Sequence, residues 1–376
     1  MKRVLHLFGE IKFSGAEIMY ASAASLFNEK GIEMLAFSTG KELGSFAPVF
    51  EEKNIKVYHY PIIRSTKISI PKFKDYINFY KFLKKEQINI LHIHRMDLYL
   101  VGLCSRIAGV TTIKTMHNVF RNKIITYPHG FLLRFIGRKL FKIKFQTISK
   151  SVYENELNYY HNPSIQINNW YNPANFYPPL HLNEKESIRK ELGIVANSLV
   201  LISVGECSEV KNHIDIIKAI NRLNEKIPLL YLHLGIGTTE TVEKELAKTL
   251  GLQDKIRFVG NTHKVRDYLI ASDIYLMPSK FEGLGNACIE AMACGLPSIL
   301  YNSPGLRDLI NNNDNGFLID PDFRGLASKI KEYIDNPQLL KLHGKNAANF
   351  VVSNFSMQQN VNKIINLYNG VKNNPI

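Results

Sequence analysis

Two glutamates beside a glycine-rich turn are the side chains whose types and spacing point most directly to chemistry. Glu282 and Glu290 are eight positions apart, and Gly283 and Gly285 lie between them. The free amides at a helix N-terminus suit a phosphate group, and a carboxylate one turn further along can accept hydrogen bonds from sugar hydroxyls. The pattern is compatible with a site for a phosphorylated, hydroxyl-rich ligand. Spacing alone leaves a second possibility open, in which Glu282 caps the helix and Glu290 faces solvent.

The sequence around these acids predicts the elements that must position them. Residues 274–277 form a short apolar run that Pro278 ends, which is typical of a buried parallel strand. Residues 280–286 would then form the turn into a helix over residues 287–294, and residues 298–301 would form the next strand. A strand, a glycine turn, a helix and a second strand make one unit of a parallel α/β sheet.

The same order of elements recurs in both halves of the chain. Near the start, residues 4–8 predict a buried strand, and a loop with Gly15 leads into a helix predicted over residues 16–30. In the second half, residues 199–204 predict a strand, and the loop that carries Lys211 opens another helix. The sequence therefore predicts the α/β class with doubly wound, Rossmann-like sheets.

The stretch from Phe281 to Ile299, FEGLGNACIEAMACGLPSI, resembles the signature of the retaining glycosyltransferases of family 4. Glu282 and Glu290 match the two acids of that family's motif, which are separated by seven residues, and Gly295 and Pro297 match residues that follow it. The resemblance implies the GT-B fold, in which two Rossmann-like domains face each other across a cleft. It also implies transfer of a hexose from a nucleotide sugar with retention, without a cofactor and without a required metal.

The resemblance also implies roles for individual residues. It assigns Glu282 and His117 to catalysis, and it assigns nucleotide-sugar binding to Gly15, Lys211, Leu284, Gly285, Asn286 and Glu290. Two positions depart from the family pattern. Ser14 stands where relatives usually have the first glycine of a pair, and Glu206 stands where relatives commonly have an arginine on the donor diphosphate.

A chain of 376 residues suits two domains of ordinary size. Asparagines and prolines break regular structure between Asn172 and Pro179, and we expect the linker there. We predict an acceptor-binding domain over residues 1–175 and a nucleotide-sugar-binding domain over residues 180–354. By resemblance, a helix over residues 355–376 crosses back to the first domain.

Neither the cysteines nor the histidines predict a metal site. The four cysteines have no paired metal spacing and no disulfide framework, which favours free thiols in a cytoplasmic protein. His92 and His94 share one face at a strand end, but no third ligand follows nearby, so packing is favoured over metal binding. No apolar run reaches the length of a membrane span.

Positive charge is concentrated in the first half. Residues 61–150 hold 18 Lys and Arg against Asp75, Glu86 and Asp97, a local charge of +15. The whole chain carries +14, so the remaining residues are close to neutral. Within residues 121–144, apolar and basic residues alternate without an acid, as in a helix that lies on an anionic membrane. The predicted membrane contacts are Arg134, Arg138, Lys139, Lys142 and Lys144. A core helix with a basic solvent face is the alternative.

These features favour a glycosyltransferase that acts on a glycan or lipid-linked acceptor, peripheral to the inner leaflet of the cell membrane, in cell-surface polysaccharide assembly. The donor is expected to be UDP-linked. A sugar-nucleotide epimerase or hydrolase of the same fold remains an alternative. A nucleic-acid-binding protein is suggested by charge alone, and no recognisable binding module supports it, so no nucleic-acid partner is expected.

Overall fold

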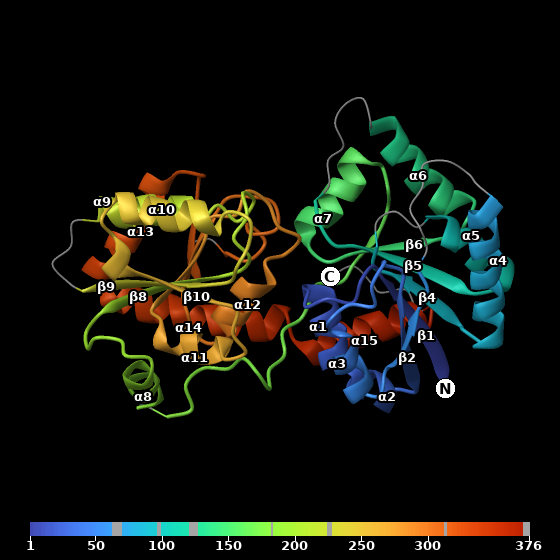
Figure 1. Cartoon of the computed structure of the whole chain (residues 1–376), viewed down its shortest axis with the longest axis horizontal. Helices are drawn as coiled ribbons and strands as arrows, with labels where there is room; N and C mark the ends of the chain where they lie inside the picture. Colours follow the sequence, from blue (N-terminus) through green and yellow to red (C-terminus); the bar gives the residue numbers. More distant parts are fainter. Residues whose placement is uncertain are drawn as a thin grey trace. The chain divides into compact units, whose positions relative to one another are not determined.

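The computed structural model describes residues 1–61, 70–95, 99–119, 127–181, 183–223, 228–311 and 314–370. The chain forms two compact units (Figure 1). Unit 1 comprises Met1–Trp170 and Met357–Ile376, and unit 2 comprises Tyr171–Ser356. No helix among the described residues is both long enough and apolar enough to cross a membrane.

Unit 1 is built on a sheet of seven parallel strands in the order β3-β2-β1-β4-β5-β6-β7. The strands are β1 (Lys2–Phe8), β2 (Ile32–Ser38), β3 (Lys56–His59), β4 (Ile90–Ile93), β5 (Thr111–Met116), β6 (Lys144–Thr147) and β7 (Ile165–Gln166). The central strands are almost wholly buried because helices cover both faces, as a parallel sheet requires.

The helices of unit 1 cover its sheet, and several of them pack into an apolar core on each face. They are α1 (Gly15–Ser22), α2 (Ala24–Glu29), α3 (Ala47–Glu52), α4 (Ile70–Lys85), α5 (Tyr99–Ala108), α6 (Tyr127–Lys139), α7 (Lys150–Glu154), the π-helical turn η2 (Asn155–Tyr159) and α15 (Met357–Tyr368). One core is formed with α4 and α5. The other joins α1, α2 and α3 to α15, whose Val361 and Ile364 are fully buried.

Unit 2 repeats this topology with six parallel strands in the order β10-β9-β8-β11-β12-β13. The strands are β8 (Leu199–Val204), β9 (Leu229–Leu234), β10 (Ile256–Gly260), β11 (Ile274–Met277), β12 (Ser298–Tyr301) and β13 (Gly316–Ile319). The helices are α8 (Glu184–Glu191), α9 (Ile214–Arg222), α10 (Glu240–Thr249), the 3-10 turn η3 (Gln253–Lys255), α11 (Val265–Ala271), α12 (Asn286–Ala293), α13 (Phe323–Asp335) and α14 (Pro337–Asn354).

Both sheets reverse their strand order next to their first strand, and both have the order of a doubly wound Rossmann sheet. The α/β prediction is therefore confirmed. In such sheets, ligands bind outside the carboxyl ends of the strands at the point of reversal. That point lies between β1 and β4 in unit 1 and between β8 and β11 in unit 2.

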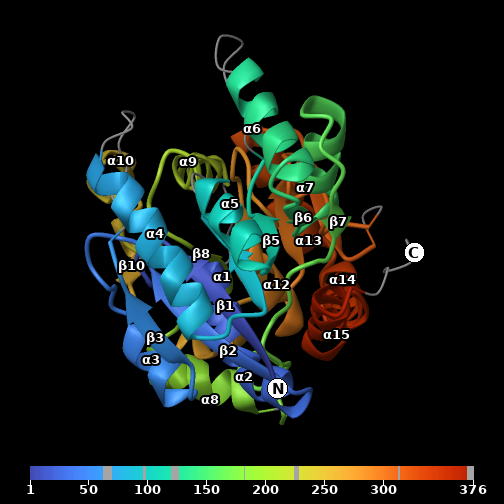
Figure 2. The same ribbon diagram turned by 90° about the vertical axis from the view of Figure 1, so that its right-hand side faces the viewer.

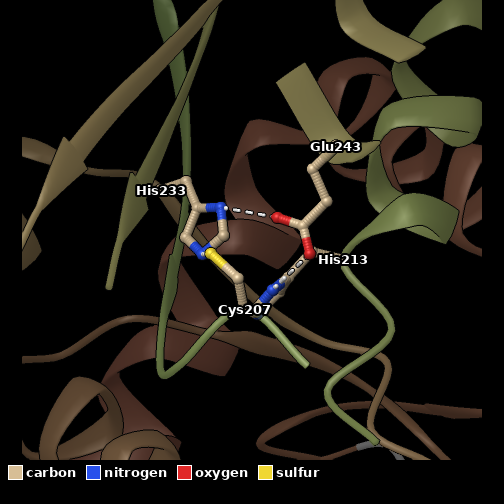
Figure 3. Close-up of side chains that lie close together, drawn as sticks. All are labelled: Cys207, His213, His233 and Glu243. Atoms are coloured by element: carbon tan, nitrogen blue, oxygen red, sulfur yellow. Dashed lines mark hydrogen bonds and ion pairs between the residues drawn. The ribbon is translucent and has the colours of Figure 1, made fainter. Parts of the chain in front are cut away.

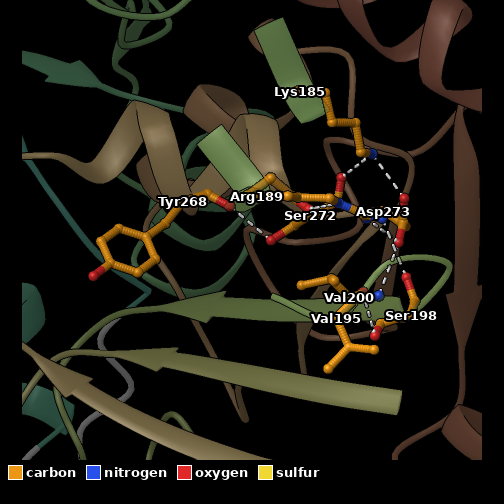
Figure 4. Close-up of polar contacts among 9 residues, drawn as sticks. Lys185, Arg189, Val195, Ser198, Val200, Tyr268, Ser272 and Asp273 are labelled. Carbon is orange, nitrogen blue, oxygen red and sulfur yellow. Dashed lines mark hydrogen bonds and ion pairs between the residues drawn. The ribbon is translucent and has the colours of Figure 1, made fainter. Parts of the chain in front are cut away.

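The amino end of the unit 2 sheet is held by a polar network around Asp273 (Figure 4). Its carboxylate accepts hydrogen bonds from Lys185 at 2.7 Å and Arg189 at 2.7 Å, both on α8, and from the backbone N–H of Val200 at 2.8 Å. Lys185 also donates to the Ser272 carbonyl. The network ties α8 to the start of β8 and β11, so it stabilises the end of the sheet opposite to the expected ligand site.

One predicted helix is interrupted. The helix expected over residues 16–30 breaks at Ala23, where φ −98° and ψ 5° depart from helical values, and it forms α1 and α2 instead. Immediately before the break, the Ser22 hydroxyl donates to the Met19 carbonyl at 2.8 Å. Serine side chains that bond to the preceding turn compete with the helix backbone, which explains a break that apolar periodicity does not reveal.

Candidate functional site

Two of the predicted ligand residues meet at the point of strand reversal in unit 2. Lys211 lies in the loop after β8, and Glu282 lies in the loop after β11. The Lys211 ammonium donates to Glu282 Oε1 at 2.7 Å, and both side chains are largely buried. The loops are also joined through their backbones, since the N–H of Lys280 donates to the carbonyl of Val210 at 2.8 Å. The structure thus brings together two residues that are 71 positions apart in the sequence.

Glycines allow this loop to come close to its neighbours. Gly285 precedes α12 with φ 74°, a left-handed conformation that suits glycine, and a Cβ there would lie 2.9 Å from Leu306. A Cβ at Gly305 would lie 2.4 Å from the carbonyl oxygen of Glu282. Asn286 begins the helix, and Leu284, in the loop before it, is buried.

Glu290 lies one turn into α12, as the sequence predicts. Burial raises the pKa of its carboxyl group to about 8. The N-cap position of α12 belongs to Gly285, and no side chain caps the helix. Glu282 is therefore not a capping residue, and Glu290 is not a freely solvated surface acid. Both acids of the predicted motif lie at the carboxyl end of the sheet, where they can serve a ligand.

In unit 1, the predicted residues lie at the carboxyl ends of β1 and β5. Gly15 is exposed and begins α1, just after the loop that follows β1. His117 follows β5 and is half-buried. Its Nε2 lies 3.1 Å from Nδ1 of His94, and Nε2 of His94 lies 3.0 Å from Nδ1 of His6. Three imidazole rings therefore form a hydrogen-bonded row from β1 through β4 to β5.

The rings of this row are neutral at physiological pH. Burial lowers the pKa of His117 to about 4 and that of His6 to about 3, and burial also lowers the pKa of His94. The buried ammonium of Lys114, on β5, lowers the pKa values of His94 and His117 further. His117 can therefore exchange hydrogen bonds with a ligand but carries no charge for a phosphate.

His6 supplies the third histidine that sequence spacing does not reveal, because it lies 88 positions before His94. His6, His92 and His94 could in principle surround a metal ion. However, His92 uses both ring nitrogens, toward Tyr368 Oη at 2.7 Å and Thr115 Oγ1 at 2.6 Å. Since both His92 and His94 use both ring nitrogens, packing and hydrogen bonding account for this cluster.

A second cluster was not predicted at all. Cys207, His213, His233 and Glu243 are buried in unit 2, and their ligand atoms lie within 4.8 Å of one another (Figure 3). They come from the loop after β8, the start of α9, strand β9 and helix α10. No short motif links them, and this is why cysteine spacing gave no signal. Burial raises the pKa of the Cys207 thiol to about 12 and lowers that of His233 to about 4.

The prediction that Arg134 contacts a membrane is wrong. Its guanidinium is buried and binds Glu156 through two hydrogen bonds, from Nε at 2.7 Å and from the second terminal nitrogen at 2.8 Å. It also lies 3.5 Å from the centre of the Tyr160 ring, a cation–π contact. A cation on an apolar helix can face inward when a buried acid pairs with it. Here the ion pair links α6 to the turn η2.

The other predicted membrane residues remain accessible. Lys139, Lys142 and Lys144 are exposed, and Arg138 is half-buried with a hydrogen bond to the His161 carbonyl at 3.3 Å. Residues 121–126 of the predicted basic segment lie outside the described residues.

Comparisons with known proteins give the family of the second unit and the fold of the chain. Residues 184–350 match the family model described as glycosyl transferases group 1. The chain is 27% identical to the Escherichia coli UDP-Gal:alpha-D-GlcNAc-diphosphoundecaprenol alpha-1,3-galactosyltransferase over 351 residues, which cover 87% of each chain.

Solved structures match over the whole length. A glycosyltransferase from Rickettsia africae has a TM-score of 0.85 at 21% identity, and the match covers 100% of this chain and 99% of the other. Anabaena Alr3699/HepE in complex with UDP has a TM-score of 0.86 at 18% identity, with 99% of this chain and 100% of the other covered. The fold is therefore GT-B, with a Rossmann-like sheet in each unit. The chain contains a glycosyltransferase group 1 domain and is a glycosyltransferase.

Proposed function

We propose that this enzyme transfers a hexose from a UDP-sugar to a lipid-linked or glycan acceptor, with retention of anomeric configuration, in the assembly of cell-surface polysaccharide. The observation that carries the proposal is the meeting of Lys211, Glu282 and the start of α12 at the strand reversal of unit 2. The similarity to a galactosyltransferase named for UDP-Gal and a diphosphoundecaprenol acceptor supports the choice of donor and acceptor.

The leaving diphosphate is the group that the site must stabilise. As the glycosidic bond breaks, negative charge grows on the phosphate oxygens, and donors fixed in advance lower the barrier. Lys211 can supply this, because an ammonium has three hydrogens and Glu282 accepts only one. The amides around Gly285 and Asn286 and the positive end of α12 add to it. We expect transfer to proceed without added Mg²⁺ or Mn²⁺.

We assign the two acids to hydroxyl groups of the donor. Glu290, one turn into α12, binds the ribose hydroxyls, and Glu282 holds the hexose hydroxyls and orients the anomeric carbon. The ion pair with Lys211 keeps Glu282 beside the diphosphate position. A carboxylate binds two hydroxyl donors more strongly than a neutral acceptor does, because hydrogen bonds to a charged group are stronger.

His117 is assigned to a hydrogen bond with the donor sugar. In one orientation of the imidazole row, His6 donates to His94, and His94 donates to Nε2 of His117. The buried Nε2 of His6, which has no partner among the residues that the structure describes, is then a bare acceptor and not an unsatisfied N–H. We favour this orientation because it also leaves Nδ1–H of His117 to donate to a sugar oxygen.

A donor screen followed by product analysis tests the proposal. Thermal shift with UDP-, GDP- and ADP-sugars should show stabilisation by one UDP-sugar, and Glu290→Ala should lose that stabilisation. Release of UDP should require an added lipid-linked or glycan acceptor, and NMR of the product should show an α-linkage from an α-linked donor. UDP release without an acceptor would favour a hydrolase, and a changed hexose would favour an epimerase.

We further propose that unit 1 binds an anionic membrane through the outer faces of α4, α5 and α6, where α5 packs between its two neighbours (Figure 2). Large apolar side chains are exposed along these helices. On α5 they recur at helical spacing, in Leu100, Leu103 and Ile107. The others are Phe73, Ile77, Leu132 and Phe135, with Leu140 just after α6. Apolar insertion beside exposed lysines is what binding to an anionic leaflet requires.

Vesicle binding tests the membrane proposal. Reversal of Lys139, Lys142 and Lys144 to glutamate should weaken binding to anionic phospholipid vesicles roughly 100-fold, since each lysine near the surface is worth about 1 kcal/mol. The matched control reverses three exposed lysines of unit 2, Lys248, Lys255 and Lys341, and should bind as the wild type does. Equal binding by both triple variants would refute the proposal.

A further inference from the structure

The Cys207 cluster differs from ordinary buried polar groups because three of its polar atoms lack a hydrogen bond of ordinary geometry. All are at least 97% buried, with exposed fractions of 0% for Cys207, 3% for His213, 0% for His233 and 1% for Glu243. Within the described parts of the chain, His213 Nδ1, His233 Nδ1 and Glu243 Oε2 make no hydrogen bond of ordinary geometry, and both nitrogens reach Glu243 only at ion-pair distance. Each unsatisfied buried polar atom costs about 1–3 kcal/mol, so three in one place require an explanation.

One ligand atom from each of the four residues lies within 4.8 Å of the other three, so a small closure of the cluster would surround an ion. His213 Nδ1 lies 3.5 Å from Glu243 Oε1, whereas His233 faces Glu243 with Nδ1 at 3.3 Å and Cys207 with Nε2 at 3.6 Å, so only one of its two nitrogens can bind the ion. Ligands that hold Zn²⁺ tetrahedrally, at about 2.0–2.3 Å from the ion, are themselves about 3.3–3.6 Å apart. Figure 3 shows both imidazole rings turned toward the carboxylate and the thiol beside the His233 ring.

We propose that Cys207, His213, His233 and Glu243 form a site for one transition-metal ion, with Zn²⁺ the best fit. Thiolate and imidazole ligands select zinc, cobalt or copper over magnesium and calcium. Four protein ligands fill a tetrahedral shell and leave no open position for a substrate, which defines a structural ion and not a catalytic one. The proposal is thus compatible with a transfer reaction that needs no added metal.

The position of the ligands indicates what the ion would do. Cys207 and His213 flank Lys211 in the loop after β8, and His233 and Glu243 lie on β9 and α10. A bound ion would link both ends of the loop that carries Lys211 to β9 and α10. This consequence for Lys211 rests on the proposed function, whereas the metal site itself does not.

Metal analysis of the whole protein tests the site. The wild type, purified and dialysed with excess Zn²⁺ and then without it, should retain about one zinc per chain by mass spectrometry. With Co²⁺ in its place, a thiolate-to-cobalt absorption band should appear in the near ultraviolet. Cys207→Ser should remove the band and His213→Gln should lower the affinity for cobalt at least tenfold. Removal of the ion by a chelator should lower the Tm of the wild type.

Cys104→Ser is the matched control, since Cys104 is also a buried free cysteine but lies on α5 in unit 1. It should keep the zinc and the cobalt band. Wild-type protein that holds no zinc or cobalt above background would overturn the proposal, even if the variants fail to fold. A cobalt band that survives in Cys207→Ser, or that is lost in Cys104→Ser, would place the ion elsewhere and overturn it as well. Retained metal with lost UDP-sugar binding would argue against the proposed function only.

Discussion

The carboxyl ends of the two sheets hold buried polar clusters that are satisfied to different degrees. In unit 1, His6, His94 and His117 bond to one another in a row, and of their buried ring nitrogens Nε2 of His6 alone lacks a partner in the described part of the chain. In unit 2, three polar atoms of the Cys207 cluster make no hydrogen bond of ordinary geometry within the described residues, and the Lys211 ammonium gives one of its three hydrogens to Glu282.

The difference separates positioning from binding. A cluster that satisfies itself needs no ligand and can hold one side chain, here His117, in a fixed orientation. A cluster with unused donors and acceptors has the capacity to hold an ion or a diphosphate. Residue type alone does not make this distinction, because both clusters are rich in histidine. Breaking a satisfied and an unsatisfied contact in turn tests this distinction.

The largest effect is expected at the best satisfied pair of unit 1. Arg134→Ala should lower the free energy of unfolding by about 3–5 kcal/mol, because it leaves the buried carboxylate of Glu156 without its cation. Urea denaturation measures this. Lys139→Ala, on the same helix but exposed, should change the free energy by no more than about 0.5 kcal/mol. Similar losses in both variants would mean that burial of the pair does not decide stability.

The next effect concerns binding in unit 2. Lys211→Ala should lower kcat/KM roughly 100- to 1,000-fold, since it removes the ammonium assigned to the leaving diphosphate. Steady-state kinetics with the preferred UDP-sugar measures the loss. Lys218→Ala, on the exposed side of α9, is the control and should stay within about twofold of the wild type. Full activity of Lys211→Ala would show that the diphosphate does not bind at Lys211.

A smaller effect is expected when the imidazole row is interrupted. His94→Phe should lower kcat about tenfold, the equivalent of one lost hydrogen bond, because His117 loses the partner that fixes its tautomer. The dissociation constant of UDP should stay unchanged, because the ring is neutral and holds no phosphate. His94→Gln, which can still donate to Nε2 of His117, should recover part of the rate. A change in UDP affinity with unchanged kcat would contradict the positioning role.

The smallest effect is a dependence on pH at Glu290. Its carboxyl pKa is raised to about 8 by burial, so below that pH the group is mostly protonated in the free enzyme. Ribose hydroxyls favour the carboxylate, so UDP binding should lower this pKa and release a proton. Affinity should therefore rise severalfold from about pH 6.5 to about pH 9. Isothermal titration measures it, and Glu290→Gln should lack the rise.

Much of this molecule is determined by local sequence. Apolar runs such as residues 274–277, followed by a glycine turn, predicted the buried strands and the helices after them. Glu282 and Glu290 were identified by spacing and resemblance, and the structure places both at the carboxyl end of one sheet. Periodicity and glycine positions succeed here because a strand, a turn and a helix are specified by residues close together in the chain.

Other features were decided only by tertiary structure. The helix over residues 127–139 carries several cations, and only the presence of Glu156 beneath it makes Arg134 the buried one. His6 joins His94 across adjacent parallel strands. The four residues of the Cys207 cluster come from four different parts of unit 2. A helical or strand pattern tells which residues share a face, but not what packs against that face. Those contacts depend on strand order, because parallel neighbours in a sheet are distant in sequence.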